Sequence, residues 1–221
     1  MEILEIKDLE TLAKKRVPKM FFDYVNSGSW TETTYNENVS DFQKIKLRQR
    51  VAIDMSNRTL ETKMINQPVS MPVAIAPTGL TGMQRADGEI LAAQAAEEFG
   101  IPYTLSTMSV CSIEAVAKKT TKPFWFQLYV MKDKKFMERL IDRAKEAKCS
   151  ALVLTLDLQL LGQRHKDLRN GLSTPPKLIP KHIYQVLTRP MWCLRMLTTK
   201  NHFFGNIVGH VEGIKDVRSL G

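Results

Sequence analysis

The sequence predicts an α/β fold of the TIM (β/α)8 barrel class, truncated to roughly the first four β/α units. Short apolar strands alternate with helical segments, which is typical of a parallel sheet. Each strand also ends on polar side chains, and in a β/α barrel the chemistry lies at the C-terminal ends of the strands. The four expected strands are residues 72–76, 101–105, 124–129 and 151–157.

The truncation follows from the spacing of these strands. The chain has 221 residues, whereas a complete β/α barrel usually needs about 250. The alternation of strands and helices also stops after Asp157, and no fifth unit follows. We therefore expect three regions: an N-terminal helical and β cap over residues 1–70, the first half of the barrel over 71–160, and a basic irregular loop over 161–221.

The cap region is expected to contain short helices followed by strands. Residues 7–27 predict two helices, because Asp8 is a good N-cap and Pro18 can open the second helix. Residues 34–44 predict another helix. Residues 51–69 are expected to form a short β region that closes one end of the barrel.

Three amphipathic helices are expected between the strands, as right-handed crossover connections require. They cover residues 87–99, 112–118 and 133–148. Gly100 is expected to cap the first of them. The buried stripe of the helix over residues 87–99 is expected to contain Ile90, Leu91, Ala95 and Phe99.

The C-terminal region carries most of the net charge of +9. Residues 158–221 contain ten Lys or Arg and three acids, which gives +7 and leaves +2 for the rest. A basic region suggests an anionic partner such as lipid headgroups or nucleic acid, and the alternative is a solvated loop. Residues 181–197 form an interrupted amphipathic segment with Trp and Tyr, which fits contact with a membrane surface or a helix over the barrel mouth.

Several other classes of function find no support in the sequence. No zinc-finger or RNP motif is present, so we expect no nucleic-acid partner. No phosphate-binding or Rossmann glycine motif is present, and no residues have metal-ligand spacing. No apolar run is long enough for a transmembrane helix, and the acidic N-terminus does not resemble a signal peptide. Three cysteines without such spacing (Cys111, Cys149 and Cys193) indicate reduced thiols in the cytosol.

Polar residues at the strand ends are the candidates for a site. Strand alternation places Gln127 and Tyr129 on one face, where buried polar groups need partners from a ligand or from neighbouring strands. Thr155 and Asp157 form a similar pair on the last strand. Arg164, in the loop that follows, suits a bidentate grip on a carboxylate, and the alternative is an ordinary surface arginine. The four histidines all lie after Asp157, away from the strand ends, so none is a convincing general base.

Together these segments resemble the FMN-dependent α-hydroxy-acid dehydrogenases and oxidases, most closely the bacterial respiratory L-lactate dehydrogenases. The matching stretches occur in family order between residues 20 and 170. They are Phe22-Asp23-Tyr24, Leu47-Arg48-Gln49-Arg50, Ser70-Met71-Pro72-Val73-Ala74-Ile75-Ala76-Pro77-Thr78-Gly79-Leu80, Leu105-Ser106-Thr107-Met108-Ser109-Val110-Cys111, Trp125-Phe126-Gln127-Leu128-Tyr129 and Leu161-Gly162-Gln163-Arg164. A weaker match continues through Phe204-Gly205-Asn206-Ile207.

The resemblance implies FMN as cofactor and the oxidation of L-lactate, or another 2-hydroxy acid, to its 2-oxo acid. It implies that electrons pass to a quinone or cytochrome acceptor at the cytoplasmic face of the inner membrane, where the protein is peripheral, or else that the protein is cytoplasmic. The residues that the resemblance assigns to FMN are Pro77, Thr78, Gly79, Ser106, Gln127 and Thr155. Those that it assigns to the substrate are Tyr24, Tyr129 and Arg164.

The resemblance also implies residues that would follow position 221. In the family these are a lysine near the flavin, the histidine base of an S-N-H-G-G motif, a second arginine and the phosphate loops. The chain also has Leu158-Gln159 where the family usually has a small residue and proline. Three interpretations therefore stay open. The chain is an active enzyme, homo-oligomeric if complete; or it is a catalytically inactive fragment or half of a split enzyme that needs a complementing C-terminal half; or it is a basic membrane-binding protein that has lost flavin binding.

Overall fold

A computed structural model describes residues 2–160, 162–172 and 179–211 of the chain. Leu161 of the expected arginine loop and residues 173–178 and 212–221 of the expected basic region lie outside the described residues. The helices are α1 (Ile6–Arg16), α2 (Lys19–Val25), α3 (Thr33–Lys44), α4 (Thr81–Gln84), α5 (Gly88–Phe99), α6 (Ile113–Ala117), α7 (Lys134–Glu146), α8 (His165–Asn170), α9 (Pro180–Leu187) and α10 (Pro190–Thr198). The strands are β1 (Thr62–Met64), β2 (Gln67–Val69), β3 (Thr104–Ser106), β4 (Trp125–Tyr129) and β5 (Ala151–Thr155).

The centre of the fold is a parallel sheet in which β4 lies between β3 and β5. The expected alternation of strands and helices is therefore confirmed for three strands. The first expected strand, residues 72–76, is reduced to a single parallel bridge between Ile75 and Tyr103. Pro72 and Pro77 flank that bridge, and proline has no N–H to donate to a sheet, so the pairing cannot extend.

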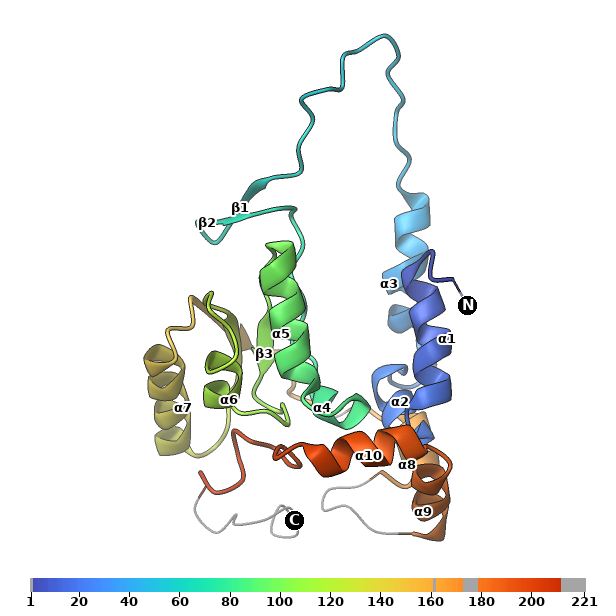
Figure 1. Ribbon diagram of the computed structural model, residues 1–221, viewed down its shortest axis with the longest axis vertical. Helices are drawn as coiled ribbons and strands as arrows, with labels where there is room; N and C mark the ends of the chain where they lie inside the picture. Colours follow the sequence, from blue (N-terminus) through green and yellow to red (C-terminus); the bar gives the residue numbers. More distant parts are fainter. Residues whose placement is uncertain (1, 161, 173–178, 212–221) are drawn as a thin grey trace.

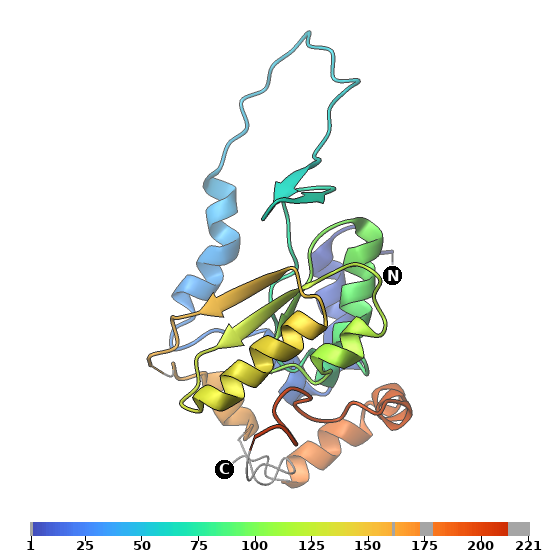
Figure 2. The ribbon, with the colours of Figure 1, turned by 90° about the vertical axis from the view of Figure 1, so that its left-hand side faces the viewer.

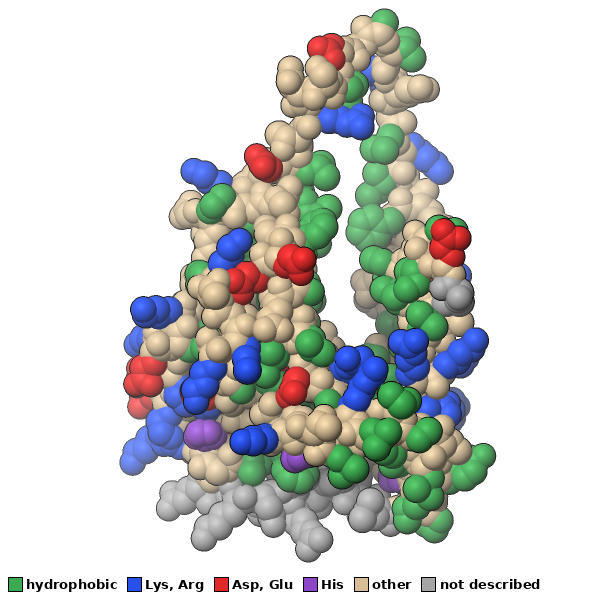
Figure 3. All heavy atoms as spheres, in the orientation of Figure 1, with side chains coloured by type: hydrophobic (Ala, Val, Ile, Leu, Met, Phe, Trp, Pro, Cys, Tyr) green, Lys and Arg blue, Asp and Glu red, His purple; other side chains and the backbone are tan. Residues whose placement is uncertain are grey.

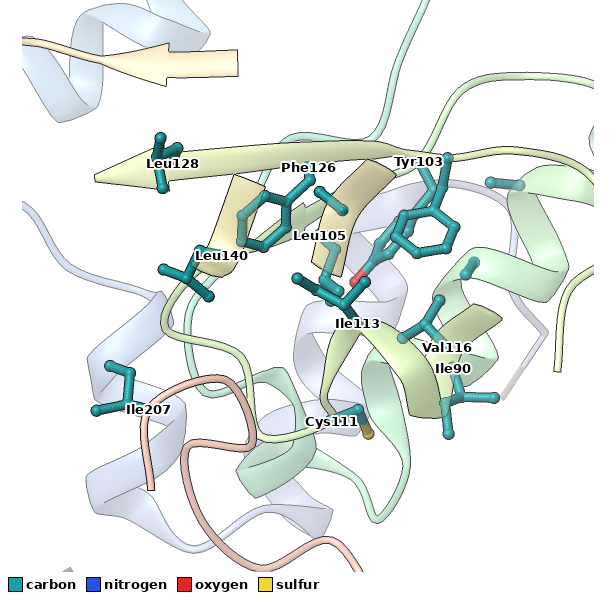
Figure 4. Packing of buried hydrophobic residues seen from close by; sticks show 14 of the residues in the cluster. Ile90, Tyr103, Leu105, Cys111, Ile113, Val116, Phe126, Leu128, Leu140 and Ile207 are labelled. Atoms are coloured by element: carbon teal, nitrogen blue, oxygen red, sulfur yellow. The ribbon is translucent and has the colours of Figure 1, made fainter. Parts of the chain in front are cut away.

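One face of the sheet carries the hydrophobic core. Leu105, Phe126 and Leu128 project from β3 and β4 toward the layer of helices α5, α6 and α7. Phe136 and Leu140 of α7 meet them from the helix side and are almost completely buried. Within this layer α6 packs against both α5 and α7 (Figure 1). Figure 4 shows the resulting cluster, which fixes the strands that carry the candidate site on their other face.

The buried stripe of α5 differs from the expected one. Ile90 is buried as predicted, but Leu91, Ala95 and Phe99 are exposed. Ala93 and Ala96 are buried instead, at a spacing of three from Ile90. The small side chains of Ala93 and Ala96 let α5 lie close to the sheet, and the large side chains of Leu91 and Phe99 then face outward.

The N-terminal region forms the expected helices but only part of the expected β region. β1 and β2 make an antiparallel hairpin, whereas residues 51–61 extend into solvent as part of a long exposed loop (Figures 1 and 2). The prediction of a β region from residue 51 was wrong for this loop, because no described strand lies beside it to accept its hydrogen bonds. α2 packs against α4, α8 and α9, so it connects the N-terminal region to the C-terminal helices.

The C-terminal region is not an irregular loop over its described part, which corrects the prediction for residues 161–221. Three helices, α8, α9 and α10, occupy most of it. Proline acts as a helix start signal here, since Pro180 and Pro190 are the first residues of α9 and α10. After α10 the chain returns to the sheet, where Asn206 is completely buried.

Candidate functional site

A line of hydrogen bonds joins the C-terminal ends of the three parallel strands. Gln127 Oε1 lies 3.3 Å from Ser106 Oγ and accepts from the Thr107 amide at 3.2 Å. Gln127 Nε2 donates to Thr155 Oγ1 at 2.7 Å. Ser106 pairs directly with Gln127 in the sheet register, which places both side chains on the face opposite the core. Neighbouring strands therefore satisfy Gln127, one of the two alternatives that the sequence left open for this buried residue.

The loop of residues 76–79 offers backbone groups beside this line. Ala76, Pro77 and Thr78 are exposed. The amides of Thr78 and Gly79 have no hydrogen-bond partner within the part of the chain that the structure describes. The following amide, that of Leu80, donates to Met108 O at 3.1 Å and ties the loop to the end of β3. The loop thus presents free N–H donors close to the strand ends.

A second group of side chains lies around Tyr24 of α2. The guanidinium carbon of Arg164 lies 4.5 Å from the centre of the Tyr24 ring, within cation–π range. The same guanidinium donates to the Tyr24 carbonyl and to Ser27 Oγ, so Arg164 is held against α2. A Cβ atom on Gly79 would lie 3.0 Å from the Tyr24 hydroxyl, which places this hydroxyl at the exposed loop. Arg164 is therefore not an ordinary surface arginine, because it is partly buried and positioned.

Tyr24 and the nearby Tyr129 of β4 both have raised pKa values. Burial raises the pKa of Tyr24, Arg164 partly opposes this, and Tyr129 and Asp167 add to it. Burial also raises the pKa of Tyr129, and the nearby Asp157 carboxylate raises it further. Both phenols therefore stay protonated at neutral pH and can donate hydrogen bonds to an anion.

The two groups are neighbours through β4. Tyr129 follows Gln127 on the same face of this strand and pairs with Thr155 in the register of β5. The structure thus brings Ser106, Gln127, Thr155 and Tyr129 to one edge of the sheet, and Tyr24 approaches the adjoining loop at Gly79.

Sequence reasoning missed the residues that hold this edge in place. Asp167 forms an ion pair with Arg164, with 3.0 Å between Oδ2 and Nε. Asn206 Nδ2 donates to Ser106 O at 3.3 Å and to Ser109 Oγ at 2.9 Å, so the returning C-terminal segment supports the end of β3. Only the three-residue spacing between Arg164 and Asp167 gave a local signal. The contacts of Asn206 span about a hundred positions of the sequence and gave none.

The histidines do not join this edge. His165 begins α8, His182 is buried in α9, and His202 and His210 lie beyond α10. Among the described residues no three metal-binding side chains come together. None of the described helices is long and apolar enough to cross a membrane.

Comparison with known proteins identifies close relatives. A family described as FMN-dependent dehydrogenase matches residues 13–219. An L-lactate dehydrogenase of Acinetobacter baylyi is 43% identical over 98% of this chain and 57% of its own length. One from Acinetobacter baumannii is 45% identical over 95% of this chain and 55% of its own length. The chain thus spans about half the length of the curated relatives that it matches.

Solved structures give a similar result. The structure of the monotopic membrane protein (S)-mandelate dehydrogenase superposes with a TM-score of 0.90 at 30% identity, over 100% of this chain and 58% of that one. A mandelate oxidase superposes with a TM-score of 0.71 at 32% identity, over 79% of this chain and 50% of that one. The three-stranded sheet is therefore part of a TIM-barrel fold whose barrel is not closed by the described strands.

Proposed function

The chain belongs to the FMN-dependent dehydrogenase family, and from this premise we propose that it supplies the N-terminal half of a barrel that oxidises a small 2-hydroxy acid. L-lactate is the substrate that we propose, because the relatives at 43% and 45% identity are named L-lactate dehydrogenases. The observation that carries this proposal is the hydrogen-bonded line of Ser106, Gln127 and Thr155 beside the exposed loop of residues 76–79.

The groups at this edge fit the polar part of a flavin. The flavin pyrimidine ring presents carbonyl oxygens and an N–H group along one edge, so it needs both donors and acceptors. Gln127, Ser106 and Thr155 offer an amide and two hydroxyls, and the free amides of Thr78 and Gly79 add donors. We assign these residues, together with Pro77, to the cofactor.

FMN, when bound, supplies the electron acceptor for oxidation of the substrate. The residues of this chain would bind and orient the hydroxy acid. Arg164 offers a guanidinium for the carboxylate, and the protonated hydroxyls of Tyr24 and Tyr129 offer hydrogen bonds to it. The contacts of Arg164 with Tyr24 and Ser27 limit its rotamers, so less entropy is lost when the substrate binds.

Completion of the barrel is part of the proposal. β5 has a partner on one side only among the described strands, and Leu152 and Leu154 on its core-side face are 46% and 50% exposed. We propose that the proton acceptor also comes from further β/α units, because none of the described histidines lies at a strand end. These units would be on the same polypeptide or on a complementing one; without them the chain is an inactive fragment.

An anaerobic flavin spectrum tests this function. The chain is purified alone and together with the four complementary β/α units of a relative, loaded with FMN, and mixed with L-lactate. We expect bound FMN to lose its visible absorption only in the completed protein, and Arg164→Met to slow this by at least about 100-fold. Bleaching by the chain alone, or in the completed protein with Arg164→Met at an unchanged rate, would contradict the proposal.

A second proposal concerns the membrane surface. α9 and α10 present apolar side chains to solvent, and one structural relative, (S)-mandelate dehydrogenase, is described as a monotopic membrane protein. The side chains in question are at least half exposed: Ile183, Tyr184, Leu187, Met191, Leu194 and Leu197. We propose that these helices lie on a membrane, near an electron acceptor there. Co-sedimentation with phosphatidylcholine vesicles should fall in Leu187→Ser/Leu194→Ser. It should not fall in Leu4→Ser/Leu47→Ser, whose side chains lie elsewhere on the chain and are even more exposed.

A further inference from the structure

A groove that is remote from the strand ends lies where α1, the α4–α5 connection and the start of α10 meet. It is an open groove of about 860 Å³. Its lining comes from one face of α1 and the residue after it, from residues 84–86, and from residues 188–192 together with Arg195. Trp192 fixes one wall, since its ring stacks on Phe21 and its Nε1 donates to Met83 O at 2.8 Å. The groove therefore has a defined wall and is not a gap between loosely placed elements.

The charge of this groove has one sign. Five basic residues contribute to its lining, and no Asp or Glu does: Lys15, Arg16, Arg85, Arg189 and Arg195. None of the five forms an ion pair with a described residue. Figure 3 shows Lys and Arg side chains gathered over this part of the surface, with apolar side chains beside them.

The cations are close enough to affect one another. Burial lowers the pKa of Arg85, and the neighbouring Arg195 and Arg16 lower it further. These three arginines come from three different elements, so the fold itself brings like charges together. Such an arrangement costs folding energy unless an anion binds between the charges.

Two buried polar atoms at the groove also lack partners. Gln84 Oε1 and Arg189 Nε have no hydrogen-bond partner within the described chain. The amide of Met191, in the first turn of α10, has none either. The Nε–H group of the Arg189 guanidinium and the Met191 amide are donors that an anion in the groove could satisfy.

The rest of the lining is apolar and continues toward the exposed faces of α9 and α10. Leu9, Leu12 and Val17 line the α1 side, and Met191 and Trp192 line the α10 side. We propose that this groove binds the phosphate headgroup of an anionic phospholipid, with arginines on the phosphate and apolar side chains beside the glycerol and upper acyl chains. The inference rests on the proposed membrane contact of α9 and α10, and it adds a discrete, headgroup-selective site to that contact.

Arginine favours this assignment over a simple anion. Its planar fork binds phosphate oxygens in pairs, and four of the five cations that line the groove are arginines. An apolar lining would be of no use to a free phosphate ion, but it matches the part of a lipid that follows the headgroup.

Titration with a short-chain phosphatidylglycerol, below its micelle concentration, tests the site without a membrane. The full chain is used, completed with the complementary β/α units where that is the soluble form, and binding is followed by calorimetry. We expect Arg85→Gln/Arg195→Gln to weaken binding by roughly 25-fold, at about fivefold for each cation lost. Lys118→Gln/Lys119→Gln removes the same charge from exposed positions remote from the groove and should change binding less than about twofold.

Each result has a defined meaning. Equal effects of the two double variants, or no binding by the unaltered chain, would overturn the site. Equally tight binding of inorganic phosphate would overturn the lipid assignment and leave free phosphate as the ligand. Lys15→Gln/Arg16→Gln, on an exposed helix surface, gives a second test if the first variant does not fold. Leu187→Ser/Leu194→Ser should leave this titration unchanged, so failure of the membrane contact and failure of the site are told apart.

Discussion

At the scale of single residues, Gln127 connects all three strands of the sheet. Its amide accepts from the Thr107 backbone and donates to Thr155, and only 1% of the residue is exposed. A side chain in this position aligns the strand ends that carry the candidate cofactor residues. Ser106, Gln127 and Thr155 hold the strand ends together and are also the groups that we assign to the cofactor. Stability of the sheet and cofactor binding are therefore coupled.

Gln127→Leu tests this coupling. Leucine is similar in size but leaves the Thr107 amide buried without its partner, which typically costs about 1–3 kcal/mol. We expect the free energy of unfolding to fall by this amount in urea denaturation, and FMN affinity to fall as well. Thr155→Ser keeps a hydroxyl at the end of the line and should change the free energy of unfolding by less than about 1 kcal/mol. Equal stability of Gln127→Leu and the unaltered chain would show that the line does not hold the edge.

Sequence reasoning reached part of this residue-level picture. Alternation along a strand placed Gln127 and Tyr129 on one face, because that period is a property of the extended backbone. The partners of Arg164 were out of reach, because Tyr24 and Ser27 lie about 140 positions earlier and meet it only through the packing of α2 on α8. Local periodicity contains no information about such contacts.

At the scale of elements, an ion pair joins α6 to α7. Arg143 donates to both carboxylate oxygens of Glu114, at 2.6 and 2.9 Å. The remaining donors of Arg143 reach Asn206, so this arginine also fastens the segment that returns from α10. The hydrogen bonds from Arg143 lower the pKa of Glu114 from 4.5 to about 2, despite the opposing effect of burial.

The direction of this shift predicts an acid-dependent loss of stability. A carboxylate whose folded pKa is lowered stabilises the fold fully above its unfolded pKa of 4.5, and this contribution is lost as the pH falls toward 2. Because Glu114 is 44% exposed, we expect Glu114→Gln to cost only about 1 kcal/mol at pH 7. Thermal unfolding between pH 7 and pH 2 should show a smaller acid-induced loss in Glu114→Gln.

The pair between Asp142 and Lys145 provides the control. This pair lies within α7, the helix that carries Arg143. Both of its side chains are about 70% exposed, so Asp142→Asn should have almost no effect on the free energy of unfolding. An acid profile of Glu114→Gln that matches the unaltered chain would show that the ion pair does not stabilise the fold.

The elements themselves were predicted where the pattern was strong. The helices between strands follow from their apolar periodicity, and Gly100 ends α5 with a positive φ of 82°, as its sequence position indicates. α8 was missed, and for residues 181–197 a membrane contact and a helix over the barrel mouth both stayed open. Proline marks both loops and helix starts, and the tertiary contacts of α9 and α10 decide between these. Trp192, for instance, docks α10 on α2 and α4 through Phe21 and Met83.

At the scale of the whole molecule, β5 is the last strand of the parallel sheet among the described residues. Leu152 and Leu154 continue the face that holds Phe126 and Leu128 in the core, but no described helix covers them. α8, which follows β5, packs on α2 instead. Within the described part of the chain, β5 therefore has an unpaired edge and a half-exposed apolar face, and these features favour association with other strands.

Leu154→Lys separates correct completion of the barrel from non-specific association. A lysine on this face should keep the isolated chain soluble, because charges on edge strands oppose strand pairing. The same charge would be buried after completion of the barrel, so the yield of FMN-loaded protein on co-expression with the complementary β/α units should fall at least about tenfold.

Leu47→Lys, at a side chain that is 95% exposed in the long loop, is the matched control and should change neither the solubility of the isolated chain nor this yield. Size-exclusion chromatography of the isolated chain and the flavin content of the completed protein measure the two effects. If Leu154→Lys supports completion as well as Leu47→Lys does, the exposed face of β5 is not where the rest of the barrel docks. The apolar row on β5 would then need another explanation.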